Sequence, residues 1–126
     1  MTKTDINTKK TILVAEDLES NYFLVQCILR KEYELIRAVD GVEAVELFHQ
    51  LKPDLILMDM RMPRMSGLEA TQEIRKHSNS VPIIALTANA FSTDRELAKE
   101  AGCSDYLSKP LSNKKLREVV ADWLKD

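Results

Sequence analysis

The chain of 126 residues has little of what marks several protein classes, with only two cysteines, three glycines and four prolines. The scarcity of glycine and proline excludes a low-complexity or collagen-like chain. Nowhere does an apolar run approach the roughly 18 residues of a membrane helix, so we expect no membrane insertion. The first ten residues are charged and lack the apolar centre of a signal peptide.

An excess of one sign of charge is also missing, since 18 basic and 20 acidic residues leave a formal net charge of −2. A nucleic-acid-binding module needs a basic face, so we expect no direct contact with nucleic acid. The length suits a single domain. Cys27 and Cys103 lack C-x-x-C or metal-ligand spacing. We interpret them as reduced thiols of a cytoplasmic protein, with a disulfide between them as the alternative.

What is present is an alternation of short apolar runs and amphipathic stretches. The runs, typical of strands buried on both faces, are residues 12–15, 35–39, 55–58, 81–86 and 106–107. The stretches with helical spacing are residues 24–29, 44–51, 68–74, 97–101 and 116–124. Five repeats of strand and helix without a hairpin signal predict parallel strands joined by crossovers. The fold class is therefore α/β, a doubly wound three-layer sandwich.

Local signals predict where some of these helices begin and end. Asp40 with Glu43, and Thr93 with Glu96, have the spacing of capping boxes. Gly102 stands where a helix is expected to stop.

Polar residues follow four of the apolar runs directly: Glu16 and Asp17 after the first, Asp59 after the third, Thr87 after the fourth, and Lys109 after the fifth. Open parallel sheets place their ligands at the carboxyl ends of the strands. We therefore expect three carboxylates, one hydroxyl and one ammonium group to converge on one edge of the sheet.

This set of groups indicates a definite chemistry. Neighbouring carboxylates repel one another unless a cation lies among them, and oxygen ligands without cysteine or histidine suit Mg²⁺. A cation beside a carboxylate nucleophile, with a lysine and a hydroxyl nearby, can perform phosphoryl transfer. Taken singly, Asp17 could be a helix cap and Lys109 a solvated loop cation. The joint occurrence at successive strand ends favours the functional interpretation.

The chain resembles the receiver domain of two-component response regulators. The resemblance spans about residues 10–123 and rests on the segments ILVAED (12–17), DLILMDMRMP (54–63), MSGLEA (65–70), PIIALTA (82–88) and DYLSKP (105–110). It implies a flavodoxin-like (βα)5 fold with strand order 2-1-3-4-5. We expect a polar tail at residues 1–9 and a receiver domain at residues 10–126.

The resemblance also implies roles around a Mg²⁺ (or Mn²⁺) ion. Asp59 would be the phosphoacceptor, attacking the phosphorus of a phosphohistidine and binding the metal. Asp17 would bind the metal directly and Glu16 through water, and the backbone carbonyl of Arg61 would add a ligand.

Further roles concern the phosphoryl group and the response to it. Lys109 would pair with phosphorylated Asp59, while Thr87 and the amide of Ala88 would hold phosphoryl oxygens. Tyr106 matches the aromatic switch of the family. The bond from Lys109 to the proline that follows it is expected to be cis.

By the same resemblance, the protein is a signalling phosphoacceptor that assists its own phosphotransfer and dephosphorylation, rather than an enzyme. Its expected partner is a sensor histidine kinase or a histidine phosphotransfer domain. The fourth helix, fifth strand and fifth helix would form the output face, through which the chain could form a homodimer. Residues 88–91 and 100–110 resemble receivers fused to hybrid histidine kinases.

Some features depart from the family or favour other interpretations. Arg61 and Asn89 stand at positions that tune phosphate lifetime, and Leu18 replaces a frequent polar residue. A flavin carrier is disfavoured because it needs a phosphate loop, and a phosphohydrolase because it needs a second acid at position 61. A degenerate receiver that only binds protein remains the alternative. His49 and His77 are interpreted as surface histidines.

Overall fold

A computed structural model describes residues 9–88 and 92–125. Its strands are β1 (Thr11–Ala15), β2 (Glu34–Ala38), β3 (Leu55–Asp59), β4 (Ile83–Thr87) and β5 (Asp105–Ser108). Its helices are α1 (Glu19–Leu29), α2 (Gly41–Leu51), α3 (Gly67–Arg75), α4 (Ser92–Ala101) and α5 (Asn113–Leu124). Except for Lys9, the predicted polar tail lies outside the described residues. None of the helices in the described part of the chain has the length and apolar character to cross a membrane.

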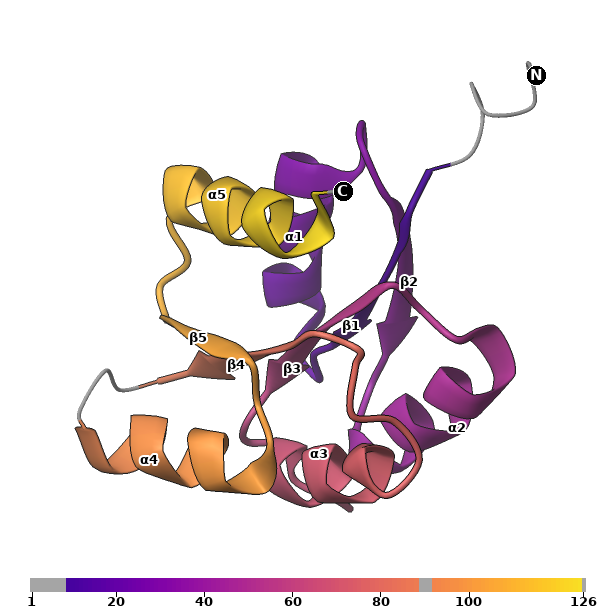
Figure 1. Ribbon diagram of the computed structural model, residues 1–126. Coiled ribbons are helices and arrows are strands. Elements are labelled where there is room, and N and C mark those ends of the chain that lie inside the picture. Colours follow the sequence, from indigo (N-terminus) through magenta and orange to yellow (C-terminus); the bar gives the residue numbers. More distant parts are fainter. Residues whose placement is uncertain (1–8, 89–91, 126) are drawn as a thin grey trace.

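All five strands run parallel, in the order β2-β1-β3-β4-β5, which confirms the predicted flavodoxin-like topology. Helices α1 and α5 cover one face of the sheet, and α2, α3 and α4 cover the other (Figure 1). Each connection leaves a strand at the same edge, so the residues that follow the strands meet there.

Alternate residues of each strand point to opposite faces of the sheet, and they divide the core into two clusters. Under α2, α3 and α4 lie the strand residues Leu13, Ala15, Ile56, Met58, Ile83 and Ala85. Under α1 and α5 lie Ile12, Val14, Leu55, Leu57, Ile84, Leu86 and Leu107. Because β1, β3 and β4 are apolar on both faces, they form a rigid base for the residues at their carboxyl ends.

Each strand differs from its predicted bounds by one or two residues, and the differences at β2 and β4 have a physical reason. Strand β2 lies at the edge of the sheet and is mostly half-exposed, so the prediction of burial on both faces was wrong there. Strand β4 begins at Ile83 rather than at residue 81, because Pro82 has no N–H to donate to the ladder. The carbonyl of Pro82 still accepts a hydrogen bond from the amide of Ile56 (2.9 Å).

The helix ends mostly follow the predicted signals. The carboxylate of Asp40 accepts from the amide of Glu43 (2.8 Å), but Glu43 reaches back to the amide of Val39 rather than to that of Asp40. Helix α4 already includes Thr93, so the predicted cap was wrong, and the side chain of Thr93 lies outside the described residues. Gly102 ends this helix at φ +112°, as predicted.

One complete capping box was missed. The hydroxyl of Ser66 accepts from the amide of Glu69 (3.2 Å), and the carboxylate of Glu69 accepts from the amide of Ser66 (3.0 Å). The spacing of serine and glutamate was visible in the sequence. The cap begins α3 close to Asp59, since a Cβ on Gly67 would lie 2.1 Å from the carbonyl oxygen of Asp59.

Candidate functional site

Three carboxylates meet at the carboxyl edge of the sheet, as the strand ends predicted. Glu16, Asp17 and Asp59 each offer one oxygen, and these oxygens lie within 4.8 Å of one another. Strands β1 and β3 are neighbours in which Ala15 pairs with Met58, so the acidic residues that follow lie side by side. Glu16 and Asp59 are only 1% and 6% exposed, whereas Asp17 is half-buried.

Lys109 supplies the positive charge of this site. Its Nζ donates to Oε1 of Glu16 and to Oδ2 of Asp59, at 3.1 Å each. The lysine follows β5, its amide donates to the carbonyl of Thr87 (2.7 Å), and its bond to Pro110 is cis, as the resemblance implied. Burial works against the charge of Lys109, but the hydrogen bonds and charges of Asp59 and Glu16 outweigh burial and raise its pKa.

For Glu16, in contrast to Lys109, burial outweighs the effect of the neighbouring opposite charge on the pKa. Burial and the negative charge of Asp59 raise the pKa of Glu16, against the lowering effect of the Leu18 amide and of Lys109. The Leu18 amide donates to Oε2 of Glu16 at 3.2 Å. Two buried carboxylates that share one ammonium group thus leave an excess of negative charge, which a bound cation would neutralise.

The donor set fits Mg²⁺, because three carboxylates lie close together without a sulfur or imidazole ligand among them. The backbone of Arg61 lies beside the same cluster, since its amide donates to Oδ1 of Asp59 (3.1 Å). The side chain of Arg61 is exposed. The role of its carbonyl as a metal ligand stays a prediction.

Thr87 and Ala88 line a small cavity of about 150 Å³ next to this cluster. Other residues around it are Met60, Arg61, Leu68, Asp94 and Leu97. Thr87 is buried at the end of β4, next to the strand that carries Asp59. The structure thus brings the predicted phosphate-binding residues to the same edge. Asn89, predicted to tune phosphate lifetime, lies outside the described residues.

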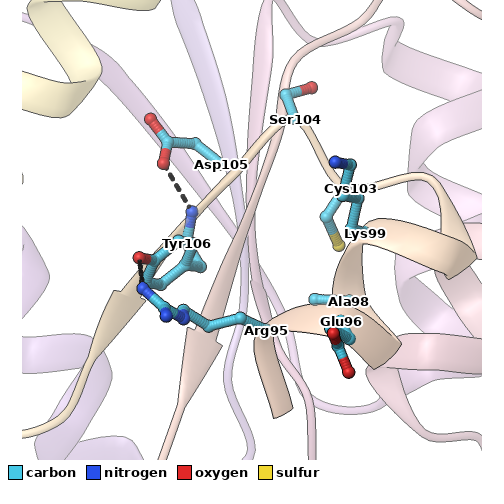
Figure 2. A pocket seen from close by; sticks show the side chains of 8 residues that line it. All are labelled: Arg95, Glu96, Ala98, Lys99, Cys103, Ser104, Asp105 and Tyr106. Carbon is cyan, nitrogen blue, oxygen red and sulfur yellow. Dashed lines mark hydrogen bonds between the residues drawn. The ribbon is translucent and has the colours of Figure 1, made fainter. Parts of the chain in front are cut away.

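Tyr106, the predicted switch residue, lies near the start of β5, away from its carboxyl end, and is half-buried. Its hydroxyl accepts a hydrogen bond from Arg95 of α4, and the guanidinium of Arg95 lies 5.1 Å from the centre of the tyrosine ring. Figure 2 shows this pair at a cavity of about 350 Å³ between α4 and β5. Cys103 lines the same cavity. The tyrosine therefore contacts α4 rather than the carboxylates.

The sequence interpretation missed Arg37, which appeared only as an interruption of an apolar run. Its Nε donates to the carbonyl of Glu16 and its Nη2 to the carbonyl of Asp17, at 3.1 Å each. The guanidinium also lies 5.4 Å from the centre of the Tyr22 ring. Arg37 thus holds the backbone that carries two of the three carboxylates. A charged residue inside an apolar strand was the only signal for it.

The geometry agrees with comparisons to known proteins. The family model of the response regulator receiver domain matches residues 12–121. The polar-differentiation response regulator DivK of Brucella anthropi is 38% identical over 120 residues, which cover 93% of this chain and 98% of DivK.

Solved structures give the same result. The receiver domain of the sensor histidine kinase PA1611 from Pseudomonas aeruginosa, with magnesium in its active-site cleft, is 38% identical with a TM-score of 0.87, over 94% of this chain and 100% of that one. The receiver domain of Ssk1 from Saccharomyces cerevisiae, in complex with the histidine phosphotransfer protein Ypd1, is 32% identical with a TM-score of 0.87, over 91% and 88% of the two chains. This chain belongs to the response regulator receiver domain family.

Proposed function

We propose that this receiver, with Mg²⁺ bound, accepts a phosphoryl group from a phosphohistidine onto Asp59. Phosphorylation then changes the conformation of the face formed by α4, β5 and α5. The observation that carries the proposal is the arrangement around Asp59. Its carboxylate is buried, bonded to Lys109, and within 4.8 Å of two further carboxylates. Such a site suits the metal-dependent transfer of an anionic phosphoryl group.

The chemistry follows from the contacts of Asp59. One carboxylate oxygen attacks the phosphorus, the bond between phosphorus and the donor imidazole breaks, and an acyl phosphate forms. Bound Mg²⁺, held by Glu16, Asp17, Asp59 and the carbonyl of Arg61, would neutralise phosphoryl oxygens. Lys109 already lies 3.1 Å from Oδ2, so it is placed to stabilise the charge that moves onto the phosphoryl group.

Thr87 and Ala88 are the residues that we expect to respond to the phosphoryl group with a change of conformation. A phosphoryl group carries about −1.5 to −2 charges, which exceeds the single charge of the carboxylate onto which it is transferred. Thr87 and Ala88 line the small cavity beside the cluster, and we assign the hydroxyl of Thr87 and the amide of Ala88 to phosphoryl oxygens. Movement of Thr87 toward the phosphate would change the packing between β4 and α4, and with it the contact of Tyr106 with α4.

The output surface is proposed on the same grounds. Trp123 of α5 is a large apolar residue that remains exposed on it, at 41%. The Nε1 of Trp123 donates to Asp105 of β5 (3.0 Å), which links α5 to the strand that carries Tyr106. A second copy of this chain is our candidate for one of its partners.

The donor is proposed to be a protein, either a histidine kinase or a histidine phosphotransfer domain. Leu18, Phe23 and Leu24 leave apolar side chains exposed at 55%, 64% and 40%, and Leu18 directly follows Asp17. An apolar surface beside the acidic cluster suits a helical partner that carries the phosphohistidine.

Four finer points complete the proposal. Residues 10–126 form the receiver domain, and Mn²⁺ can replace Mg²⁺ because both prefer oxygen ligands. The free thiols of Cys27 and Cys103 suit the cytoplasm. The motifs near positions 88–91 and 100–110 favour an origin in a hybrid histidine kinase, for which the similarity to the PA1611 receiver is the support.

The test is to incubate the protein with Mg²⁺ and acetyl phosphate and to record its intact mass. We expect one phosphoryl adduct that is absent with EDTA and absent in Asp59→Asn. The matched control is Asp122→Asn, which removes an exposed carboxylate of α5 and should leave the adduct unchanged. An adduct that persists in Asp59→Asn would overturn the assignment, and no adduct in the unmodified protein would favour the degenerate receiver.

A further inference from the structure

Two histidines that the proposed function does not use lie together at the edge of the sheet opposite to Asp59. His49 is near the end of α2 and His77 follows the end of α3, and both are exposed. Their ring centroids are 4.7 Å apart with the planes at 81°. The two residues are far apart in sequence and meet only because α2 and α3 pack side by side (Figure 1).

This spacing matches that of a shared metal ion. Two imidazoles bound to one tetrahedral zinc ion, with Zn–N bonds of about 2.0–2.1 Å, hold their ring centroids roughly 5 Å apart. Both rings border a hollow of about 520 Å³ whose lining includes Asp54, so solvent and ions can reach them. Imidazole is a preferred ligand of Zn²⁺, Ni²⁺ and Cu²⁺, and a poor one for Mg²⁺.

Glu73 is a third group near the two histidines, although its oxygens do not lie at ligand distance from both rings in this structure. It lies on α3, four residues before His77, which follows the end of that helix. The pKa of Glu73 is lowered, chiefly by its hydrogen bond to Lys76 and the charge of Lys76, and in smaller part by His77 and His49. The bond to Lys76 (2.7 Å) is exposed, and such ion pairs are weak enough to exchange for a stronger partner.

We propose that His49 and His77 form a binding site for a borderline-soft divalent cation of the zinc class, with Glu73 or water completing the coordination. The site is separate from the acidic cluster and does not depend on phosphorylation. A bound ion would connect the ends of α2 and α3, and it would therefore stabilise the folded protein in proportion to its concentration.

The test is calorimetric titration of the full chain with Zn²⁺ in excess Mg²⁺, which keeps the acidic cluster occupied. We expect one Zn²⁺ per chain, with affinity at least about tenfold weaker in His49→Ala and in His77→Ala, since loss of even an indirect metal contact costs this much. Glu73→Gln should have a smaller effect. Zn²⁺ should raise the melting temperature of the unmodified protein but not of either histidine variant.

Three control variants keep the result specific. Asp17→Asn and Asp59→Asn should bind Zn²⁺ like the unmodified protein, and so should Cys27→Ser, which removes the exposed thiol. Unchanged Zn²⁺ binding in both histidine variants would overturn the proposal, as would loss of binding in any of the three controls. Because the acidic-site variants are tested for Zn²⁺ rather than for phosphorylation, failure of this site leaves the phosphoacceptor assignment untouched.

Discussion

The two edges of the sheet carry different chemistry for one structural reason. At the carboxyl edge, Glu16 and Asp59 belong to or directly follow the central strands, so they are buried and held in register by the sheet. At the opposite edge, His49 and His77 belong to helix ends and are exposed. Strand ends therefore supply buried oxygen ligands, whereas helix ends supply exposed imidazoles, and the two edges favour cations of different hardness.

The energetics differ in the same way. Lys109 is about three-quarters buried and contacts two carboxylates, so its loss leaves charges without a partner. The Lys76–Glu73 pair at the other edge is largely exposed and is worth little. Substitution of the buried charged residues at the carboxyl edge should therefore affect both activity and stability, whereas substitution of His49, His77 or Glu73 at the opposite edge should affect metal binding alone.

The largest effect is expected for Lys109→Met. Without the ammonium group, phosphoryl transfer from acetyl phosphate should slow by about 100-fold or more, as when one charge-stabilising donor is removed from an active site. Mg²⁺ binding should persist, since the three carboxylates remain. Time-resolved intact mass measures the rate. A rate within a factor of two of that of the unmodified protein would show that the buried charge of Lys109 matters no more than the exposed charges at the opposite edge.

Two glycines allow a direct comparison of the edges. A Cβ on Gly67 would lie 2.1 Å from the carbonyl oxygen of Asp59, so Gly67→Ala forces a backbone shift that should cost about 2–3 kcal/mol. Gly102→Ala, at the opposite edge, is strained by its φ of +112° and should also lower stability.

Of the two variants, Gly67→Ala alone should slow phosphorylation as well, because Gly67 packs against the backbone of Asp59 whereas Gly102 packs against Arg75. Urea unfolding measures the free energies of unfolding, and intact mass measures the phosphorylation rates. Equal loss of phosphorylation in Gly102→Ala would contradict the separation of the edges.

A smaller effect is expected for Arg37→Ala. This arginine holds the backbone carbonyls of Glu16 and Asp17 but contacts neither carboxylate. Its loss should weaken Mg²⁺ binding about tenfold, which is typical of groups that orient metal ligands. Arg37→Lys should recover part of the affinity, since one donor can still reach. Calorimetric titration with Mg²⁺ checks both variants, and Zn²⁺ binding should stay unchanged in each.

The smallest effect concerns Asp40, a carboxylate at the carboxyl edge outside the cluster. The hydrogen bond from Arg64 (2.7 Å) and that from the amide of Glu43 lower the pKa of Asp40, although burial opposes them. A lowered pKa in the folded state stabilises the protein above the unfolded value of about 3.9, and the stabilisation is lost as the pH falls through the folded pKa.

Asp40→Asn keeps the helix cap but removes the charge. At pH 7 the variant should be less stable by about 0.5–1 kcal/mol, the range of partly exposed ion pairs. The gap should close as the pH falls below about 3.9. Urea unfolding at several pH values measures it, and a gap that does not vary with pH would show that charge contributes nothing here.

Much of the fold could be predicted because its signals are local. The apolar runs indicated all five strands, and alternation with helical stretches indicated the parallel sheet. The edge position of β2 was implied only by the family resemblance, because the order of strands arises from long-range pairing that local patterns do not encode. The capping box of Ser66 and Glu69 was local and was nevertheless missed.

The candidate site divides in the same manner. The sequence could predict these residues together because each ends or follows a strand, and parallel strands end at one edge: Glu16, Asp17, Asp59, Thr87 and Lys109. The sequence by itself therefore determined the order of elements and the chemical character of the carboxyl edge.

Only the tertiary structure decided which distant groups meet. Arg37 reaches the carbonyls of Glu16 and Asp17, and His49 meets His77, through contacts made across 20 or more residues of chain. Such contacts depend on strand register and helix packing, which the sequence immediately around each of these residues does not encode. Residue type and local pattern specify what a side chain can do, and packing specifies what it can reach.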